Sequence, residues 1–511
     1  MKFFPRESGV LLHITSLPGP YGIGEIGQEA FKFIDILSEM GQSLWQILPI
    51  ADTGSCNSPY TTVSAFANNP LLISFDGLIK EGYLKQSDLN GFKKYSAQKV
   101  DYNNIISDRI KILDTACERF LNNDAGIIKQ QFESFCSEND YWLHNYTLFL
   151  TLKQIHHNKN WTEWEMKYAS DNDKAFEEVK KQYQSFIQKL KIQQYLFYIQ
   201  WLRLKKYANK NGIRIVGDIP IYISHDSADV WANSDLFKLD KYGHMKFQSG
   251  CPPDYFLEDG QVWGHPIYNW AAHEKSNYQW WIDRLRYLFT LVDIVRIDHF
   301  NGFAKYWEIP IEQNNDSTGK WVKGPGEKLL LTVKKNIGSK PIIADDLGEA
   351  TKYAKIIRDK FDIPGMKILQ MSFGKEEQSN GSIPGLNYKN IVIYTGTHDN
   401  DTSFGWLHTK PGKDNIQTAA EITLERKRAL KFLGTDGSEF NWDFISLAMN
   451  SKANTVIIPL QDILGLGPNA RMNTPGTIKG NWEWRFKKDK LTSDIIERMR
   501  TLTEESKRMK N

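Results

Sequence analysis

The sequence predicts an α/β fold, a (β/α)8 barrel of the TIM type. Eight short apolar runs rich in β-branched residues recur along the chain. Each ends abruptly in polar residues, which is typical of parallel strands buried on both faces. Helical patterns, such as those over residues 27–40 and 423–432, separate most of these runs, as the crossovers between parallel strands require. The eight runs are residues 10–15, 44–49, 213–220, 293–300, 341–348, 366–370, 390–402 and 454–461.

A long stretch rich in Lys, Gln and aromatic residues separates the second run from the third. We assign residues 1–75 to strands one and two, and residues 76–190 to a helical insertion subdomain. An apolar stripe at helical spacing could form a groove for a partner, but packing against the barrel is the commoner role. The stripe consists of Phe176, Val179, Tyr183, Phe186 and Leu190.

The remaining residues, 191–511, then hold strands three to eight. They include a second insertion, residues 221–280, which is rich in Pro, Gly, Trp and Tyr. Its low helical periodicity predicts long ordered loops, and such loops in compact domains usually serve function. After strand eight we expect a helix over about residues 491–508.

The composition argues against several classes of partner. The 511 residues include 64 basic and 61 acidic side chains, a formal net charge of +3, which gives no electrostatic case for nucleic acid or anionic membranes. No apolar run approaches the roughly 18 residues of a membrane helix, and residues 1–6 have no signal-peptide core. The four cysteines lack metal-ligand spacing, so we expect reduced thiols in a cytoplasmic protein and no metal site. Nothing in the sequence predicts an oligomeric partner.

The ends of the predicted strands carry the residues suited to chemistry. In a barrel, functional side chains gather at the carboxyl ends of the strands. Carboxylates from strands three, four, five and seven would therefore meet at the barrel mouth, where they can carry out acid/base chemistry. The residues at these ends are Asp218, Arg296, Asp298, Asp345, Asp346, His398, Asp399 and Asp401.

Strand parity places Arg296 and Asp298 on one face of strand four. A neighbouring cation lowers the pKa of a carboxylate, so we expect Arg296 to hold Asp298 ionised, as a nucleophile must be. The alternative is a buried ion pair that only closes the top of the barrel, which would leave the other acidic strand ends unexplained.

The loops indicate a class of substrate. Aromatic faces beside hydrogen-bonding groups suit sugar rings, whose C–H faces stack while their hydroxyls need partners. Loop aromatics can equally be anchors that pin an insertion to the barrel. The loop residues of this kind are Ser58, Tyr60, Tyr255, Phe256, Gln261, Trp263, His265, Tyr268 and Trp270.

Several long motifs, in order along nearly the whole chain, resemble those of the amylomaltase family, the 4-α-glucanotransferase branch of the α-amylase clan. This family implies a TIM barrel without a C-terminal β-sandwich domain, and a retaining enzyme that uses no metal or organic cofactor. Its partners are maltooligosaccharides and α-1,4-glucans. The matching segments are residues 58–60, 217–222, 252–256, 296–300, 344–348, 394–402 and 471–476.

The resemblance also implies roles for individual residues. Asp298 is the nucleophile, Asp345 stands at the acid/base position, and Asp399 is the third carboxylate, which binds sugar hydroxyls and helps to distort the ring. Tyr60 stacks on the sugar at the cleavage point, and Gln261 and Trp263 line the acceptor side. The full set implied to bind substrate is Ser58, Tyr60, Asp218, Asp254, Gln261, Trp263, Arg296, His398 and Asn473.

One position departs from the family pattern. The family has Glu-Asp-Leu-Gly where this chain has Asp345 followed by residues 346–348, so the acid is one methylene short. The carboxyl group is thereby withdrawn by roughly 1.5 Å, the length of one C–C bond. A misplacement of about 1 Å can cost on the order of 10²-fold in rate, so we expect a slow 4-α-glucanotransferase. The alternatives are an α-glucan hydrolase on the same barrel and a catalytically impaired glucan-binding protein.

Overall fold

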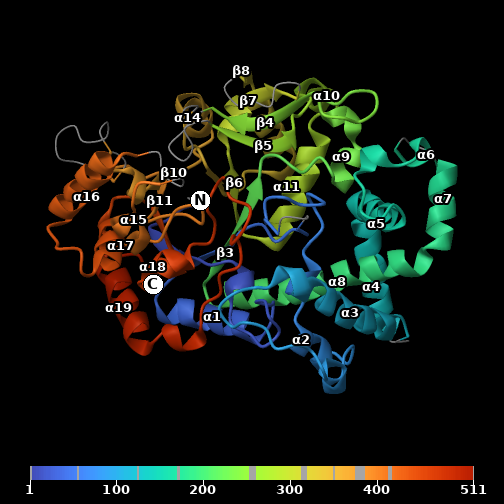
Figure 1. The fold of residues 1–511 in the computed structure, drawn as a ribbon, viewed down its shortest axis with the longest axis horizontal. Coiled ribbons are helices and arrows are strands. Elements are labelled where there is room, and N and C mark those ends of the chain that lie inside the picture. The colour runs from blue at the N-terminus through green and yellow to red at the C-terminus, as the bar shows by residue number, and fades with distance from the viewer. Residues whose placement is uncertain are drawn as a thin grey trace.

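The computed structural model describes residues 3–53, 57–122, 126–169, 173–252, 260–311, 319–348, 351–374, 386–412 and 417–509. A parallel barrel of eight strands lies at its centre (Figure 1). The ladder runs in the order β10-β11-β12-β1-β2-β3-β6-β9, and the Ala344 N–H, donating to the Pro364 carbonyl at 2.9 Å, links its two ends. The strands are β1 (Glu7–Leu11), β2 (Leu44–Gln46), β3 (Arg214–Pro220), β6 (Ile294–Asp298), β9 (Ile342–Ala344), β10 (Gly365–Ile368), β11 (Ile391–Tyr394) and β12 (Thr455–Pro459).

The eight strands confirm the predicted barrel, although several of them begin or end at other residues than predicted. β1 begins three residues before the predicted run, and the chain turns into a 3-10 helix at Ile14–Ser16. β11 ends at Tyr394, so the rest of the run 390–402 is a loop beyond the strand. Close pairing of β1 with β2 requires Gly9, because a Cβ there would collide with Leu44.

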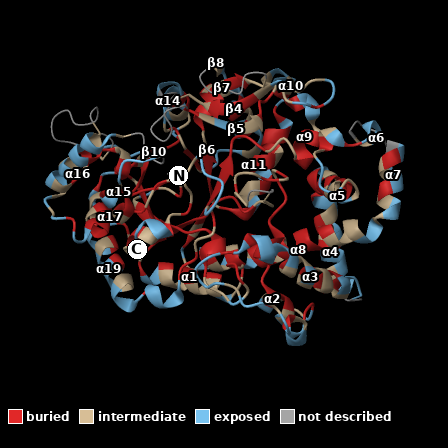
Figure 2. Cartoon of the chain, in the orientation of Figure 1, coloured by how far each residue is buried: buried red, intermediate tan, exposed pale blue. Residues whose placement is uncertain are grey.

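Helices cover the barrel, and their outward faces are exposed while the strands are buried (Figure 2). The amphipathic pattern that predicted them is the reason for this arrangement. The helices before β3 are α1 (Gln28–Glu39), α2 (Phe75–Lys80), α3 (Tyr102–Leu121), α4 (Gly126–Glu138), α5 (Asp140–Ile155), α6 (Met166–Ala169), α7 (Asp173–Gln182) and α8 (Gln184–Lys210). Those after it are α9 (Ala228–Ala232), α10 (Trp270–Lys275), α11 (Gln279–Leu291), α12 (Asn301–Ala304), α13 (Glu327–Ile337), α14 (Thr351–Lys360), α15 (Ser403–His408), α16 (Ala419–Leu433), α17 (Phe440–Asn450), α18 (Leu460–Ile463) and α19 (Ser493–Glu505).

Helices α3 to α8 extend to one side of the barrel, on the right of Figure 1. The predicted apolar stripe lies on α7 and α8, and Leu190 is buried. The predicted domain boundary at residue 190 falls inside α8, which runs on without a break to Lys210. The division into domains stays a prediction.

The second insertion was predicted to consist of loops, and in this respect the prediction was wrong. It contains two strands, β4 (Phe247–Cys251) and β5 (Gln261–Pro266), besides α9 and α10. They join β7 (Lys305–Pro310) and β8 (Lys320–Lys323) in an antiparallel sheet of order β5-β4-β7-β8, at the top of Figure 1. Two of its strands come from sequence far beyond the insertion, so no local pattern could indicate the pairing.

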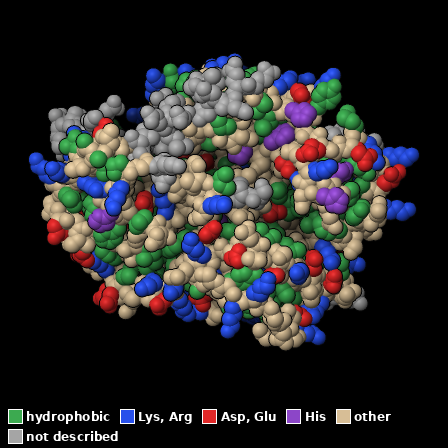
Figure 3. Space-filling view, viewed as in Figure 1, with side chains coloured by type: hydrophobic (Ala, Val, Ile, Leu, Met, Phe, Trp, Pro, Cys, Tyr) green, Lys and Arg blue, Asp and Glu red, His purple; other side chains and the backbone are tan. Residues whose placement is uncertain are grey.

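Basic and acidic side chains are interspersed over the face shown in Figure 3, as the small net charge leads one to expect. Among the described helices, none is both long and apolar enough to cross a lipid bilayer. Cys117 and Cys136 are free thiols.

Candidate active site

Arg296 lies at the centre of the acidic cluster. It is buried on β6, and its guanidinium reaches the ends of the two flanking strands, β3 and β9. Nη1 donates to Asp218 Oδ2 at 2.6 Å, while Nη2 contacts Asp345 Oδ2 at 2.7 Å and Asp298 Oδ1 at 3.1 Å. One buried cation therefore holds three of the strand-end carboxylates together.

These contacts set the spacing between Asp298 and Asp345. Because one oxygen of each contacts the same nitrogen, at 3.1 and 2.7 Å, those two oxygens are at most 5.8 Å apart. Retaining glycosidases place their carboxyl groups roughly 5–5.5 Å apart, and inverting ones roughly 6.5–9.5 Å apart. The upper bound of 5.8 Å lies below the inverting range and agrees with a retaining enzyme.

The three proposed catalytic carboxylates are all within reach of a ligand. The side chains of Asp298, Asp345 and Asp399 keep 28%, 15% and 34% of their surface exposed. Asp218, by contrast, is sealed beneath them and has no exposed side-chain surface. In the structure Asp218 contacts Arg296 and Tyr60, and its predicted part in binding the sugar stays a prediction.

Arg296 acts on the nucleophile in the expected direction, but the net pKa of Asp298 is raised and not lowered. Burial raises the pKa of Asp298 well above the usual range of an aspartate, and the neighbouring carboxylates raise it further. Arg296 lowers the pKa of Asp298, but it is shared among three acids and does not outweigh these effects. Burial would also lower the pKa of Arg296, yet the surrounding carboxylates raise it well above its usual value.

The loop after β11 supplies the third carboxylate. Asp399 Oδ1 accepts a hydrogen bond from Asn473 Nδ2 at 2.6 Å, and Oδ2 lies 3.4 Å from His398 Nε2. The Asp399 carbonyl accepts from Arg471 Nη2 at 2.7 Å. Burial lowers the pKa of His398, so its imidazole is neutral at pH 7. The predicted residues His398, Asp399 and Asn473 thus form one connected group.

Tyr60 joins that group to the Arg296 cluster. Its hydroxyl donates to Asp218 Oδ2 at 2.8 Å, and its ring stacks on His398 with 5.0 Å between centroids. Ser58 Oγ accepts from the Tyr60 N–H at 3.2 Å and closes the turn that presents the ring. The predicted binding of substrate by Ser58 stays a prediction.

The residues predicted to line the acceptor side lie beside the end of β6. Trp263 Nε1 donates to Gln261 Oε1 at 3.0 Å, and the Trp263 ring meets that of His299 edge to face at 4.7 Å. His299 in turn donates from its backbone N–H to Asp345 Oδ2 at 3.4 Å. Asp254, the remaining predicted residue, lies outside the described residues.

Sequence reasoning missed several neighbours of the site. His299 has a left-handed φ of 52°, which turns the chain directly after Asp298. Trp482 packs against both Tyr60 and His398, at 5.8 Å from each ring. His13 lies near His398 at the end of β1, and burial together with His398 lowers its pKa to about 3. His299 had a usable signal, its place directly after Asp298 near the end of the predicted strand 293–300.

Comparison with known proteins agrees with this geometry. A family model described as 4-alpha-glucanotransferase matches residues 12–492. The chain belongs to the 4-alpha-glucanotransferase family. It is 43% identical over 500 residues to the 4-alpha-glucanotransferase of Streptococcus pneumoniae, covering 98% of this chain and 96% of that protein. It is 39% identical over 508 residues to the 4-alpha-glucanotransferase of Thermus thermophilus, and the match covers 99% of each chain.

Among solved structures, the amylomaltase from Streptococcus agalactiae in complex with acarbose superimposes with a TM-score of 0.92. It is 35% identical, and the match covers 99% of this chain and all of that one. An amylomaltase from Corynebacterium glutamicum, 18% identical with a TM-score of 0.76, shares the fold and covers 99% of this chain and 75% of that one.

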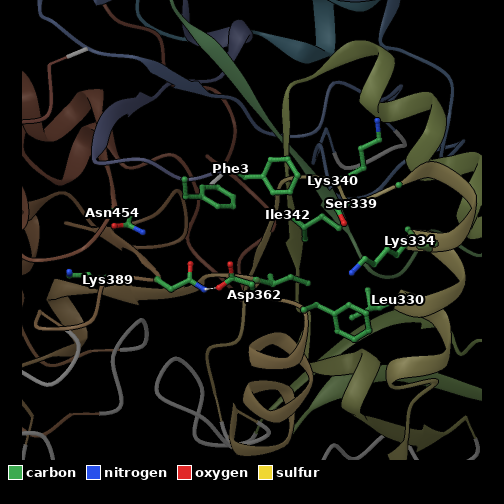
Figure 4. Close-up of a pocket in the computed structure, with 15 residues that line it drawn as sticks. Phe3, Leu330, Lys334, Ser339, Lys340, Ile342, Asp362, Lys389 and Asn454 are labelled. Atoms are coloured by element: carbon green, nitrogen blue, oxygen red, sulfur yellow. Dashed lines mark hydrogen bonds between the residues drawn. The ribbon is translucent and has the colours of Figure 1, made fainter. Parts of the chain in front are cut away.

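In this member of the 4-alpha-glucanotransferase family a large hollow, of about 640 Å³, lies away from the acidic cluster (Figure 4). Its lining includes Ile342 at the start of β9, and Asn390 and Asn454 just before β11 and β12. It therefore opens at the amino ends of the strands, whereas barrel enzymes carry their chemistry at the carboxyl ends. We place the active site at the Arg296 cluster for that reason.

Proposed function

We propose that the protein is a 4-α-glucanotransferase, which moves α-1,4-glucan segments from a donor to the 4-hydroxyl of an acceptor glucan or glucose. The observation that carries the proposal is the closeness of Asp298 and Asp345. One oxygen of each contacts the same Arg296 nitrogen, so these two oxygens are at most 5.8 Å apart. Membership of the family supports the choice of substrate. No step of the proposal requires a metal or an organic cofactor.

The first step is a displacement at the anomeric carbon. The Asp298 carboxylate attacks that carbon, and the bond to the glycosidic oxygen breaks as the acid at position 345 gives its proton to the leaving oxygen. A covalent β-glucosyl enzyme forms, and the donor's remaining chain departs as an alcohol. Asp399, held by Asn473, binds hydroxyls of the reacting sugar.

The second step regenerates the enzyme. The acceptor's 4-hydroxyl loses its proton to Asp345 and attacks the same carbon, which releases the Asp298 carboxylate and restores the α configuration. Water competes with the acceptor at this stage. Gln261 and Trp263, joined by a hydrogen bond beside His299, give an acceptor sugar a platform and cover the site against water.

The short acid at position 345 slows both steps. Its Oδ2 already accepts hydrogen bonds from Arg296 Nη2 at 2.7 Å and from the His299 N–H at 3.4 Å. An Asp side chain bound in this way extends less far toward the glycosidic oxygen than the family's Glu would.

The experiment is an assay of maltotriose with the protein and with its Asp345→Glu variant. We expect a ladder of longer glucans with little gain in reducing ends, and faster ladder formation by the variant. A net gain in reducing ends would indicate the hydrolase instead. Binding without turnover in both proteins would indicate a glucan-binding protein, and an unchanged or lower rate in the variant would contradict the role assigned to Asp345.

We also propose that the enzyme acts in the cytoplasm on soluble maltooligosaccharides. The free thiols of Cys117 and Cys136 support this location, since oxidising compartments favour paired cysteines.

A further inference from the structure

A second hollow lies between the helical insertion and the barrel, well separated along the fold from the one in Figure 4. It has a volume of about 300 Å³ and is bounded by α5, the loop after β2, α9 and the start of α11. These helices lie on the right of Figure 1. We call it the α5–α11 hollow. Its volume is at the lower end of the range for small-molecule sites, enough for one or two sugar rings.

One wall of the α5–α11 hollow is an aromatic platform. Tyr141 is 48% exposed, although its ring packs edge to face on buried Phe66 at 5.7 Å. Phe66 stacks in turn on buried Trp142, with 6.2 Å between centroids and planes 8° apart. The ring of Tyr141 is therefore held by packing while much of its surface stays free for a ligand.

Hydrogen-bonding groups lie next to this platform. Asn145 follows Tyr141 by four residues on α5, so both are on the same face of the helix. Across the hollow lie Asn233 and Asp235. Within the described part of the chain, the Asn145 amide and the Asp235 carboxylate make no hydrogen bond to another side chain or to the backbone. They are available to the hydroxyls of a ligand.

The charge of the lining narrows the class of ligand. The described residues that line the α5–α11 hollow include Asp229, Asp235 and Asp283 but no Lys, Arg or His, so the lining itself does not favour an anionic ligand. Arg286 beside the hollow is paired with Asp283 at 2.6 Å. The hollow in Figure 4, which carries Lys334, Lys340 and Lys389, has the opposite character. An aromatic face beside neutral amides and carboxylates suits an uncharged, polyhydroxylated ring.

The loop that contains Tyr60 and Phe66 connects the α5–α11 hollow to the active site. Phe66 follows Tyr60 by six residues, which at full extension span roughly 20 Å. Asp229 fixes this loop, since its Oδ2 accepts from the Ala65 N–H at 2.7 Å and its Oδ1 from Trp280 Nε1 at 3.0 Å. A glucan chain bound in the hollow is thus held close to the catalytic cleft.

We infer that the α5–α11 hollow is a second glucan-binding site, which holds one or two sugar rings of an α-glucan against Tyr141. The inference rests on the proposed function for the identity of the sugar. Its role is to retain long glucans near the cleft between transfers.

The test is calorimetric titration with maltoheptaose, with all variants carrying Asp298→Asn so that the glucan is not consumed. We expect two binding events. Tyr60→Ala weakens the event at the catalytic cleft, and Tyr141→Ala weakens the other by about tenfold, the loss expected for one stacked face. Asn145→Ala, a second variant in the hollow, weakens that same event several-fold.

Two control variants distinguish the loss of the Tyr141 ring from nonspecific effects of substituting a tyrosine. Tyr141→Phe keeps the ring, and Tyr242→Ala removes a 54% exposed tyrosine outside the hollow, so both should retain the two events. A single event that Tyr60→Ala abolishes and Tyr141→Ala leaves unchanged would overturn the inference. Two events in a protein that forms no products from maltotriose would contradict the proposed function while supporting this site.

Discussion

Arg296 donates a hydrogen bond from Nη2 to Oδ2 of Asp345 at 2.7 Å, across the neighbouring strands β6 and β9. The same nitrogen contacts the proposed nucleophile, Asp298. The group expected to protonate the leaving oxygen is therefore bound to the cation that also positions the attacking carboxylate.

The first prediction concerns the leaving group. With maltotriose, whose leaving alcohol needs a proton, Asp345→Glu should raise the transfer rate by about 10²-fold, within the range of general acid catalysis. With an α-maltosyl fluoride donor, whose leaving fluoride needs little assistance, the gain should be less than about tenfold. Initial rates with both donors provide the measurement. An equal gain with the two donors would mean that the substitution does not act on protonation.

The second prediction concerns pH. Asp298 must be ionised to attack, and burial raises its pKa. As the pH falls, Asp298 therefore becomes protonated at a higher pH than an ordinary aspartate does. The acidic limb of kcat/KM, which reports the free enzyme, should therefore lie well above pH 4. A profile of kcat/KM for maltotriose from pH 3 to 8 measures it. A limb at or below pH 4 would contradict a raised pKa for Asp298.

The third prediction concerns the acceptor side. Trp263→Ala removes the ring beside His299 and exposes the glucosyl enzyme to water. The KM for glucose as acceptor should rise by up to about tenfold, and the share of hydrolysis should rise with it. Product analysis by chromatography measures both quantities. Trp263→Phe is the control, because it keeps an aromatic face. The same ratio of hydrolysis to transfer in the unaltered protein and in both variants would contradict this role of Trp263.

The fourth prediction separates Asp345 from its neighbour. Asp346 is buried, its Oδ1 accepts from the Met366 N–H at 3.0 Å, and its Oδ2 pairs with Arg358 Nε at 3.0 Å. Asp346→Ala removes the buried partner of that cation, so it should cost about 3 kcal/mol of unfolding free energy. The control is Asp359→Ala, at an exposed partner of the same Arg358, which should cost less than about 1 kcal/mol. Thermal unfolding of the two variants compares them, and equal losses would contradict the structural role of Asp346.

The sequence predicted the barrel and the strand ends for a physical reason. Buried parallel strands are apolar throughout, so the first polar residue marks where each emerges, and this placed Asp218, Asp298 and Asp345 together. Parity along β6 also placed Arg296 on the face of Asp298, as their 3.1 Å contact shows.

Other features depend on relationships that no single segment contains. The contact of Arg296 with Asp345 depends on the register of β6 against β9, in which Arg296 pairs with Ile343. The raised pKa of Asp298 comes first from its burial and then from acids contributed by other strands. Trp482 reaches Tyr60 across more than four hundred residues of chain. The antiparallel sheet β5-β4-β7-β8 likewise joins short strands that are distant in sequence.

The most direct test of the mechanism is to trap the covalent intermediate. A 5-fluoro-α-glucosyl fluoride donor forms a glucosyl enzyme that turns over slowly, and peptide mass mapping then locates the sugar. We predict a single glucosyl adduct on the peptide that contains Asp298, and no adduct in the Asp298→Asn variant. An adduct on Asp345 or Asp399, or products of inverted configuration with no adduct at all, would contradict the account.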